Sequence, residues 1–479
     1  MRFQINEVQA DGHWVPLTDH RVSDNFENIF TLIVGQNAVG KSRLLRKIVS
    51  NYIFPQVSRI KSSITPTYYY NNGFPKLINS ENNNSKEKNY FDLVNNPPPY
   101  EPYLYQVNNF NSDEVRVSLS SISSPSNVIA VSTGRHDRFP SAAHVRDKEM
   151  ITEYRYIGTD QFSKNSISSS LISLLEGLLQ GRSNIHKLSD IFEYLGFTPY
   201  LDIKLTFDKK QYSKLKDEER HELHNTSSQP LLDFLMGEGT NFYGTYFSEG
   251  DFYEQLKSRS KTHIELHFWD YSLGMKYNTI AELMPLLKSG MIKITDITLI
   301  SLSNKSRMRL SQASSGQQCM LTIMLGIAGA IKDGSLICID EPEISLHPQW
   351  QTNLVKQLQE VFSNFTGCHF VIATHSPQIV SGLTSHNGYV LNLEEKKLYH
   401  SIEYAKRSAD FQLAQVFHTP GYNNEYLLRI TLLLLTKLTR REELNHDDRQ
   451  CIGMLVSVRN NMSDADPIYH LIGQVEALY

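Results

Sequence analysis

The sequence predicts an α/β fold, and three short apolar runs carry that prediction. The runs are IFTLIV at residues 29–34, LICI at 336–339 and HFVIA at 369–373. Continuous apolar runs of this length are typical of strands that are buried on both faces of a sheet. The first run leads through GQNAVGKS into RLLRKIVSNYI, which has helical spacing. Strands that alternate with helices predict a sheet covered by helices.

Length and composition narrow the class of protein. A chain of 479 residues is too long for one ordinary core, so we expect two or three structural units. The net charge of -4 excludes a general basic field for nucleic acid. The four cysteines form no CxxC pair, which disfavours zinc or a disulfide framework and fits a reducing cytoplasm. With no apolar signal core and no apolar run long enough to span a bilayer, we expect a cytoplasmic protein.

Residues 35–42, GQNAVGKS, match the phosphate-loop pattern G-x-x-x-x-G-K-[ST] between a predicted strand and a predicted helix. Glycines let the backbone curl around phosphate, and the N–H groups of the loop and helix face the β-phosphate. Lys41 would bridge β and γ oxygens, and Ser42 would ligate Mg²⁺. A chance match is the alternative, which the flanking strand and helix disfavour. The expected nucleotide-binding residues are Gly35, Gln36, Asn37, Ala38, Val39, Gly40, Lys41, Ser42 and Arg43.

The other two apolar runs also end in polar side chains. Asp340 and Glu341 follow the second run, at the edge where ligands gather in parallel sheets. Asp340 would hold the Mg²⁺ shell, and Glu341 would orient or deprotonate the attacking water. A solvated strand end is the alternative. His375 follows the third run, and contact with the γ-phosphate is its expected role, although a lone His is more often structural.

Together these motifs resemble the ABC-type ATPase head, in the branch of RecF, SMC heads and OLD ATPases. The family order is Walker A, signature, Walker B, D-loop and switch His. Here it reads GQNAVGKS, ASSGQ at 313–317, Asp340-Glu341, ISLHPQ and His375. The resemblance implies a head with a mixed central sheet, ATP and Mg²⁺ as cofactors, and catalytic roles for Glu341 and His375. By the same resemblance, Leu346 and His347 belong to the D-loop.

In that family the signature faces the γ-phosphate held by a partner protomer. The resemblance therefore implies a head-to-head dimer, with a signature in trans formed by Ser314, Ser315, Gly316 and Gln317. Ser315 stands where the family has Gly, which puts the loop geometry in doubt. The family's Q-loop Gln should follow NVIAVS. Asp137 is the candidate there, either as a Mg²⁺ or water contact or as a salt-bridged loop residue.

The chain divides into four expected regions. They are a first ATPase lobe at 1–165 with a polar insertion at about 55–126, an inserted mainly helical lobe at 166–300, a second ATPase lobe at 301–403 and a helical C-terminal region at 404–479. SMC-like and OLD-like heads have an insertion of this size between Walker A and the signature, and transporter heads lack it. The region has no sustained heptad pattern, so we do not expect a long coiled-coil arm.

DEPEISLHPQWQ and ATHSPQIV resemble the AAA15 ATPases of anti-phage defence, and the tail looks like the PtuA family of Septu-type and retron-linked systems. This resemblance implies an ATPase subunit that controls a separate HNH nuclease, PtuB-like. A RecF-like DNA-repair ATPase is the alternative. A nuclease built on Asp464 and Asp466 is a third, disfavoured because DADP looks like a surface turn. Basic clusters at 257–261 and 304–309 fit nucleic acid contacts or solvated faces.

Overall fold

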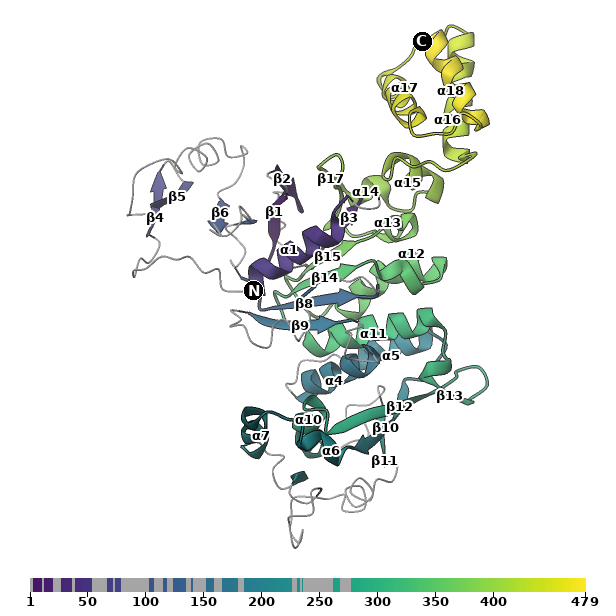
Figure 1. Cartoon of the computed structure of the whole chain (residues 1–479). Coiled ribbons are helices and arrows are strands. Elements are labelled where there is room, and N and C mark those ends of the chain that lie inside the picture. Colours follow the sequence, from purple (N-terminus) through teal and green to yellow (C-terminus); the bar gives the residue numbers. More distant parts are fainter. Residues whose placement is uncertain are drawn as a thin grey trace.

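A seven-stranded sheet forms the centre of the structure, a computed structural model, in the order β17-β16-β3-β15-β14-β8-β9 (Figure 1). The structure describes residues 3–10, 13–19, 27–36, 39–53, 67–71, 74–78, 103–106, 115–118, 124–134, 139–140, 152–158, 166–179, 185–225, 231–232, 235, 262–267 and 277–479. The strands are β3 (Ile29–Val34), β8 (Asn127–Ser132), β9 (Glu153–Ile157), β14 (Leu336–Asp340), β15 (His369–Ala373), β16 (Gly388–Asn392) and β17 (Lys397–His400). All neighbours pair in parallel except β17, which runs antiparallel to β16, so the expected mixed sheet is confirmed.

Two apolar layers cover the two faces of this sheet. Leu336 and Cys338 of β14 belong to the core shared with helix α1 (Lys41–Ile53). Ile337 and Ile339 belong to the larger core shared with α11 (Ser315–Ala330) and α12 (Pro348–Val361). Successive residues of a strand point to opposite faces, so a strand with helices on both sides must be apolar throughout.

Four short strands form a smaller sheet in the order β2-β1-β7-β6. They are β1 (Ile5–Ala10), β2 (His13–Pro16), β6 (Tyr103–Gln106) and β7 (Val115–Ser118). A separate hairpin pairs β4 (Thr67–Asn71) with β5 (Phe74–Ile78). Strands β4 to β7 fall within the expected polar insertion, so its described residues include β structure that the sequence did not predict.

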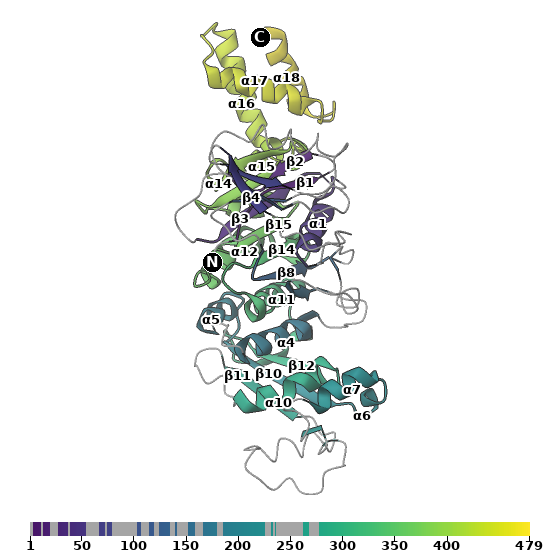
Figure 2. The ribbon, with the colours of Figure 1, turned by 90° about the vertical axis from the view of Figure 1, so that its left-hand side faces the viewer.

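The inserted lobe contains both helices and a sheet. Its helices are α4 (Ser166–Leu179), α5 (Ile185–Tyr194), α6 (Lys209–Tyr212), α7 (Asp217–His224) and α10 (Tyr277–Lys288). Its strands are β10 (Tyr200–Phe207), β11 (Thr262–His267), β12 (Ile292–Ile300) and β13 (Arg307–Arg309), in the antiparallel order β11-β10-β12-β13. The helices were expected, and the four-stranded sheet was not; its strands β10, β11 and β12 lie between α4 and α10 (Figure 2).

Helix α4 of the lobe packs so closely against α11 that the backbones of the two helices are in contact. A Cβ built on Gly329 would lie 2.2 Å from the main-chain carbonyl of Ser173, and one built on Gly177 would lie 2.4 Å from the Gly329 oxygen. Ser170 Oγ donates to the Thr322 carbonyl at 3.0 Å. Small residues at the crossing allow this approach, so the lobe is fixed to the helix that follows the signature.

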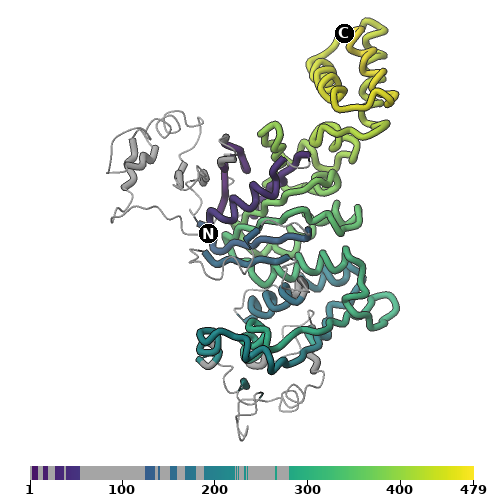
Figure 3. Tube along the Cα trace, in the orientation of Figure 1, coloured from purple at the N-terminus to yellow at the C-terminus, as the bar shows by residue number. Residues whose placement is uncertain are grey.

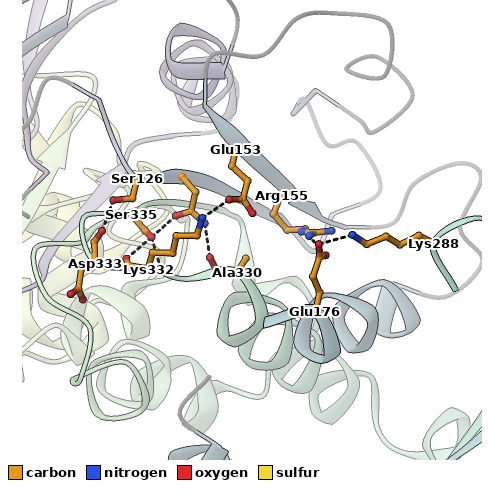
Figure 4. A network of polar contacts seen from close by, with 10 residues as sticks. Ser126, Glu153, Arg155, Glu176, Lys288, Ala330, Lys332, Asp333 and Ser335 are labelled. Atoms are coloured by element: carbon orange, nitrogen blue, oxygen red, sulfur yellow. Dashed lines mark hydrogen bonds and ion pairs between the residues drawn. The ribbon is translucent and has the colours of Figure 1, made fainter. Parts of the chain in front are cut away.

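A polar network joins the lobe to the edge of the central sheet (Figure 4). Glu176 of α4 is paired with Arg155 of β9 and with Lys288 of α10. Lys332, just after α11, is paired with Glu153 of β9. Burial alone would raise the pKa of Glu176, but Arg155 and Lys288 together hold that pKa below its usual range. Glu176 is therefore ionised where sheet and lobe meet.

The C-terminal region is helical, as expected, and ends in a unit of three helices that projects from one end of the head (Figure 3). That unit consists of α16 (Glu425–Thr439), α17 (His446–Arg459) and α18 (Pro467–Leu478), which share their own apolar core. The short helices α13 (Pro377–Gly382), α14 (Ser401–Tyr404) and α15 (Ala409–Gln415) lead to it. None of the helices in the described ranges has the length and apolar character needed to cross a bilayer.

Candidate functional site

The phosphate-loop motif lies between β3 and α1, as the sequence predicts. Gly35 has φ +151° and Gly40 has φ +106°, conformations that L side chains rarely adopt. A Cβ on Gly35 would also lie 2.9 Å from the Val39 side chain. The backbone conformation at both positions therefore requires glycine. Asn37 and Ala38 lie outside the described residues.

Lys41 is 4% exposed, and its ammonium group has three polar neighbours. Nζ donates to the carbonyls of Gly35 at 2.8 Å and Gln36 at 3.0 Å, and it lies 3.1 Å from Nδ1 of His375. An ammonium group has three donors, so these contacts use its full capacity. Burial lowers the pKa of Lys41 to about 8, although nearby carboxylates oppose the shift.

Ser42 and Asp340 meet directly, although 298 positions separate them. The Ser42 hydroxyl donates to Asp340 Oδ1 at 3.0 Å. Both side chains offer an oxygen atom as a metal ligand, and Mg²⁺ is commonly held by one or two protein oxygens together with substrate phosphate and water. The pair therefore fits the expected metal site. Asp137, the other proposed Mg²⁺ or water contact, lies outside the described residues.

Glu341 has a left-handed backbone, with φ 47° and ψ 53°, directly after β14. Its N–H donates to the Ala373 carbonyl at 2.9 Å, and its own carbonyl accepts from Thr133 Oγ1 at 2.7 Å. For a residue other than glycine this conformation is strained, and such strain is common at functional sites. Here the contacts to β15 and to the end of β8 hold it in place.

His375 links the two halves of the site. Nε2 lies 3.3 Å from Glu341 Oε1, while Nδ1 faces Lys41. Burial, and then the Lys41 charge, lower the pKa of His375. One neutral tautomer satisfies both neighbours: Nδ1 accepts from Lys41, and Nε2–H donates to Glu341. The structure thus brings together Lys41, Ser42, Asp340, Glu341 and His375.

Sequence reasoning missed two residues that support this cluster. Glu343 Oε1 accepts the backbone N–H of His375, and burial raises the pKa of the Glu343 carboxyl. Thr133 holds the Glu341 carbonyl. A third acidic residue in DEPE was visible in the sequence as a signal for Glu343. No pattern marked Thr133, because its role depends on the pairing of β8 with β14.

The signature residues form the start of α11. Ser314 caps the helix: its Oγ accepts from Gln317 N at 3.2 Å, and Gln317 Oε1 accepts from Ser314 N at 3.0 Å. Gln317 Nε2 also donates to the Leu195 carbonyl at 2.9 Å, in the inserted lobe. Ser314 and Ser315 are exposed, so the start of α11 lies at the surface.

The D-loop lies beside the signature. A Cβ built on Gly316 would lie 2.8 Å from the Ser345 carbonyl and 2.7 Å from the Trp350 ring, so only glycine allows this approach. Leu346 is buried beneath the loop. His347 is exposed and caps α12, with Nδ1 accepting from Gln349 N at 3.3 Å.

A cavity of about 600 Å³ opens beside the phosphate loop, along α1. Its lining includes Gly40 and Arg43, which continue from the loop. Val15, Val39 and Leu393 give it apolar walls. Arg46, Lys47, Glu394 and Lys396 add charged groups to the lining, and a cavity of this mixed character next to a phosphate cradle is a suitable place for a nucleoside. Val15 lines this cavity, whereas its neighbour Trp14 is not among the lining residues.

A family model described as "AAA domain, putative AbiEii toxin, Type IV TA system" matches residues 30–381. The chain belongs to this AAA-domain family. The match includes the phosphate loop, the signature and His375. The AAA-domain assignment agrees with the ATPase class that the motifs predict.

Two curated relatives of this AAA-domain chain carry the words "probable ATPase". The Retron Ec83 probable ATPase of Escherichia coli is 28% identical over 183 residues, which cover 35% of this chain and 32% of the relative. The Retron Vc95 probable ATPase of Vibrio cholerae serotype O1 biovar El Tor is 25% identical over 109 residues, covering 23% and 20%. The aligned parts thus span a third or less of those relatives.

Among solved structures, the crystal structure of Stu0660 of Streptococcus thermophilus aligns over 98% of this chain and 93% of its own, with a TM-score of 0.30 and 11% identity. A likeness at that level carries no argument about function.

Proposed function

We propose that the chain binds ATP with Mg²⁺ and hydrolyses it. One observation carries the proposal: the Ser42–Asp340 contact lies in the same cluster as Lys41 and as the Glu341–His375 pair. Phosphoryl transfer needs a phosphate cradle, a metal site and a group that orients water. Three strand ends, from β3, β14 and β15, supply these parts.

The residues divide the work as follows. Lys41 takes phosphate oxygens, and to do so it must give up one of its three present contacts. Loss of the His375 contact would expose Nδ1, which must take up a proton before it can donate to a γ-phosphate oxygen, while Nε2–H stays with Glu341. Glu341 would orient or deprotonate the attacking water. Ser42 and Asp340 would hold Mg²⁺, which when bound neutralises charge on the phosphate oxygens.

We place this ATPase in an anti-phage defence complex, where it controls a separate nuclease effector (HNH, PtuB-like) through ATP-dependent head dimerisation. The retron names of the two relatives support the defence setting. The exposed Ser314 and Ser315 at the start of α11 support a site completed by a second copy. The projecting C-terminal unit gives the head a second surface for a partner.

Native mass spectrometry tests the effector part of the proposal. The chain is expressed with its neighbouring genes and purified by a tag on the chain. A stable complex with a nuclease-like polypeptide is the expected result. The chain alone, together with tight ATP-dependent DNA binding, would favour the RecF-like DNA-repair alternative instead.

A further inference from the structure

The turn between β16 and β17 lies against the entrance to the phosphate loop. Asn392, the last residue of β16, is paired with Val34, the last residue of β3. The next amide, Leu393 N, donates to the Val34 carbonyl at 2.9 Å. Residues 393–396 therefore begin where the strand that carries the loop ends.

Glu394 of this turn holds the first peptides of the loop. Its Oε1 accepts the N–H of Gln36 at 2.6 Å. A Cβ on Gly35 would lie 3.7 Å from the same oxygen. Lys41 Nζ donates to the carbonyl of Gln36 at 3.0 Å. Glu394 and Lys41 thus hold the main-chain N–H and the main-chain carbonyl of the same residue. Hydrogen bonds from N–H groups to a carboxylate are shorter and stronger than neutral ones.

The same turn is bound to the segment that leads into the C-terminal unit. Asn392 is 1% exposed, and its Oδ1 accepts from the N–H groups of Glu394 at 3.0 Å and Glu395 at 3.1 Å. Its Nδ2 donates to the Val416 carbonyl at 3.0 Å. Glu395 Oε1 lies 2.8 Å from Nε2 of His418. The side chains of one turn thus contact both the phosphate loop and residues 416–418.

Residue 418 in turn contacts the C-terminal helices. His418 has φ +50°, which is unusual for a residue other than glycine. Its carbonyl accepts from Asn461 Nδ2 at 3.1 Å, in the loop between α17 and α18. A continuous set of contacts therefore runs from Gln36 through the turn to the three-helix unit, and coupling between distant sites needs such a physical path.

We infer that Glu394 is a positioning residue of the phosphate loop, and that the β16–β17 turn couples nucleotide binding to the C-terminal unit. The inference rests on the proposed ATP binding. Nucleotide that reorders Lys41 and the peptides of Gly35 and Gln36 changes the bond to Glu394. The turn passes that change to residues 416–418 through Asn392 and Glu395.

The test uses the full chain with Glu394→Ala, Glu394→Gln and a matched control, Lys397→Ala, at an exposed position on the same hairpin. Titration with a fluorescent ATP analogue gives the affinity. Hydrogen exchange with and without a non-hydrolysable ATP analogue follows amides 416–424. Glu394→Ala should raise the Kd about three- to ten-fold and abolish the nucleotide-dependent exchange change, even at saturation. Glu394→Gln keeps an acceptor oxygen and should restore both, and Lys397→Ala should match wild type.

Equal affinity of Glu394→Ala and Lys397→Ala would overturn the inference. So would wild-type exchange at 416–424 that is the same with and without nucleotide. In both cases the wild type still binds ATP, and the proposed function stands. A wild-type chain that does not bind ATP overturns the proposed function and this inference with it.

Discussion

Glu343 shows how a single side chain can set the position of a functional group without touching substrate. It accepts the N–H of His375, and Glu343→Ala leaves that amide without its acceptor. An unsatisfied group of this kind costs about 1–3 kcal/mol. We expect kcat for ATP hydrolysis to fall about ten-fold or more with little change in KM, since the hydrogen bonds of Lys41 and Ser42 do not involve Glu343. Steady-state kinetics measures both constants.

Glu343→Gln, which keeps an acceptor oxygen, should recover most of the activity, and Glu443→Ala at an exposed position should behave as wild type. If Glu343→Ala raises KM and leaves kcat unchanged, the assigned role is wrong.

The roles proposed for Lys41 and Glu341 separate nucleotide binding from hydrolysis. Lys41→Ala removes the ammonium group that would hold phosphate, and the Kd for ATP should rise about ten- to hundred-fold. Glu341→Gln keeps the shape of the site but removes the base, and hydrolysis should slow by about a hundred-fold or more with binding retained. Titration and single-turnover hydrolysis separate the two effects. Wild-type hydrolysis by Glu341→Gln would remove the role assigned to Glu341.

At the scale of single residues, the sequence predicts the site residues that belong to short motifs or directly follow an apolar strand. The structure brings Lys41, Ser42, Asp340, Glu341 and His375 together because parallel strands end at one edge of the sheet. Thr133 and Glu394 could not be predicted in this way. Each acts through one hydrogen bond to the main chain of a residue far away in sequence, and such a bond leaves no spacing pattern.

At the scale of elements, the α4–α11 crossing depends on Gly329. Gly329→Ala places a methyl group 2.2 Å from the Ser173 backbone, so the helices must separate. Overpacking of this kind costs typically about 1–3 kcal/mol, and Tm should fall. Gly453→Ala in α17 is the matched control, since a Cβ there meets nothing within 4 Å. The control should keep or raise Tm, because alanine favours helix. Equal Tm changes would contradict the close packing.

The Glu176 network makes stability depend on pH. The folded-state pKa of Glu176 lies below its ordinary value of 4.5, so its contribution to stability is fully present above that value. The contribution is lost as pH falls through the lower, folded-state pKa. Glu176→Gln should therefore be less stable than wild type at pH 7, and the difference should shrink below about pH 4.5. Urea unfolding at a series of pH values measures it. A difference that is constant with pH would contradict the assigned ionisation.

Elements with strong local patterns are predicted well. Strands β3, β14 and β15 and helices α16 to α18 follow apolar periods that the sequence displays. The sheet of the inserted lobe was missed because β12 is only partly buried and alternates irregularly, with a register shift where it pairs with β10. Its partner β10 is also distant in sequence, as β11 is from β10, so pairing, not local preference, defines these strands.

At the scale of the whole molecule, the proposed dimer with shared sites predicts complementation. Lys41→Ala lacks a working phosphate loop, and Ser315→Arg places a bulky cation at the exposed start of α11. Each should be inactive alone. Mixed, they should regain part of the ATPase activity, because the heterodimer joins one intact loop to one intact signature. Activity is measured over a range of mixing ratios. A mixture as inactive as its parts would argue against a site shared between copies.

The C-terminal helices were predicted from sequence, but their attachment was not. Asp466 illustrates the difference. DADP looked like a surface turn, and Asp464 is exposed, yet Asp466 is 1% exposed and accepts from Ile468 N and Asn423 N, both at 2.9 Å. It begins α18 and ties that helix to the segment before α16. These bonds use both carboxylate oxygens of Asp466, which leaves the nuclease alternative without support from this residue.

The backbone contact between α4 and α11 has a mechanical consequence. Two helices that meet at Gly177 and Gly329 have no side-chain layer between them to deform, so they cannot slide past each other. We expect a rotation of the signature helix to carry α4 with it. Strands β10, β11 and β12 lie on the other side of α4 from α11, so α4 connects this sheet to the signature helix (Figure 2). We therefore expect a change at the signature to be felt in the inserted lobe through this crossing.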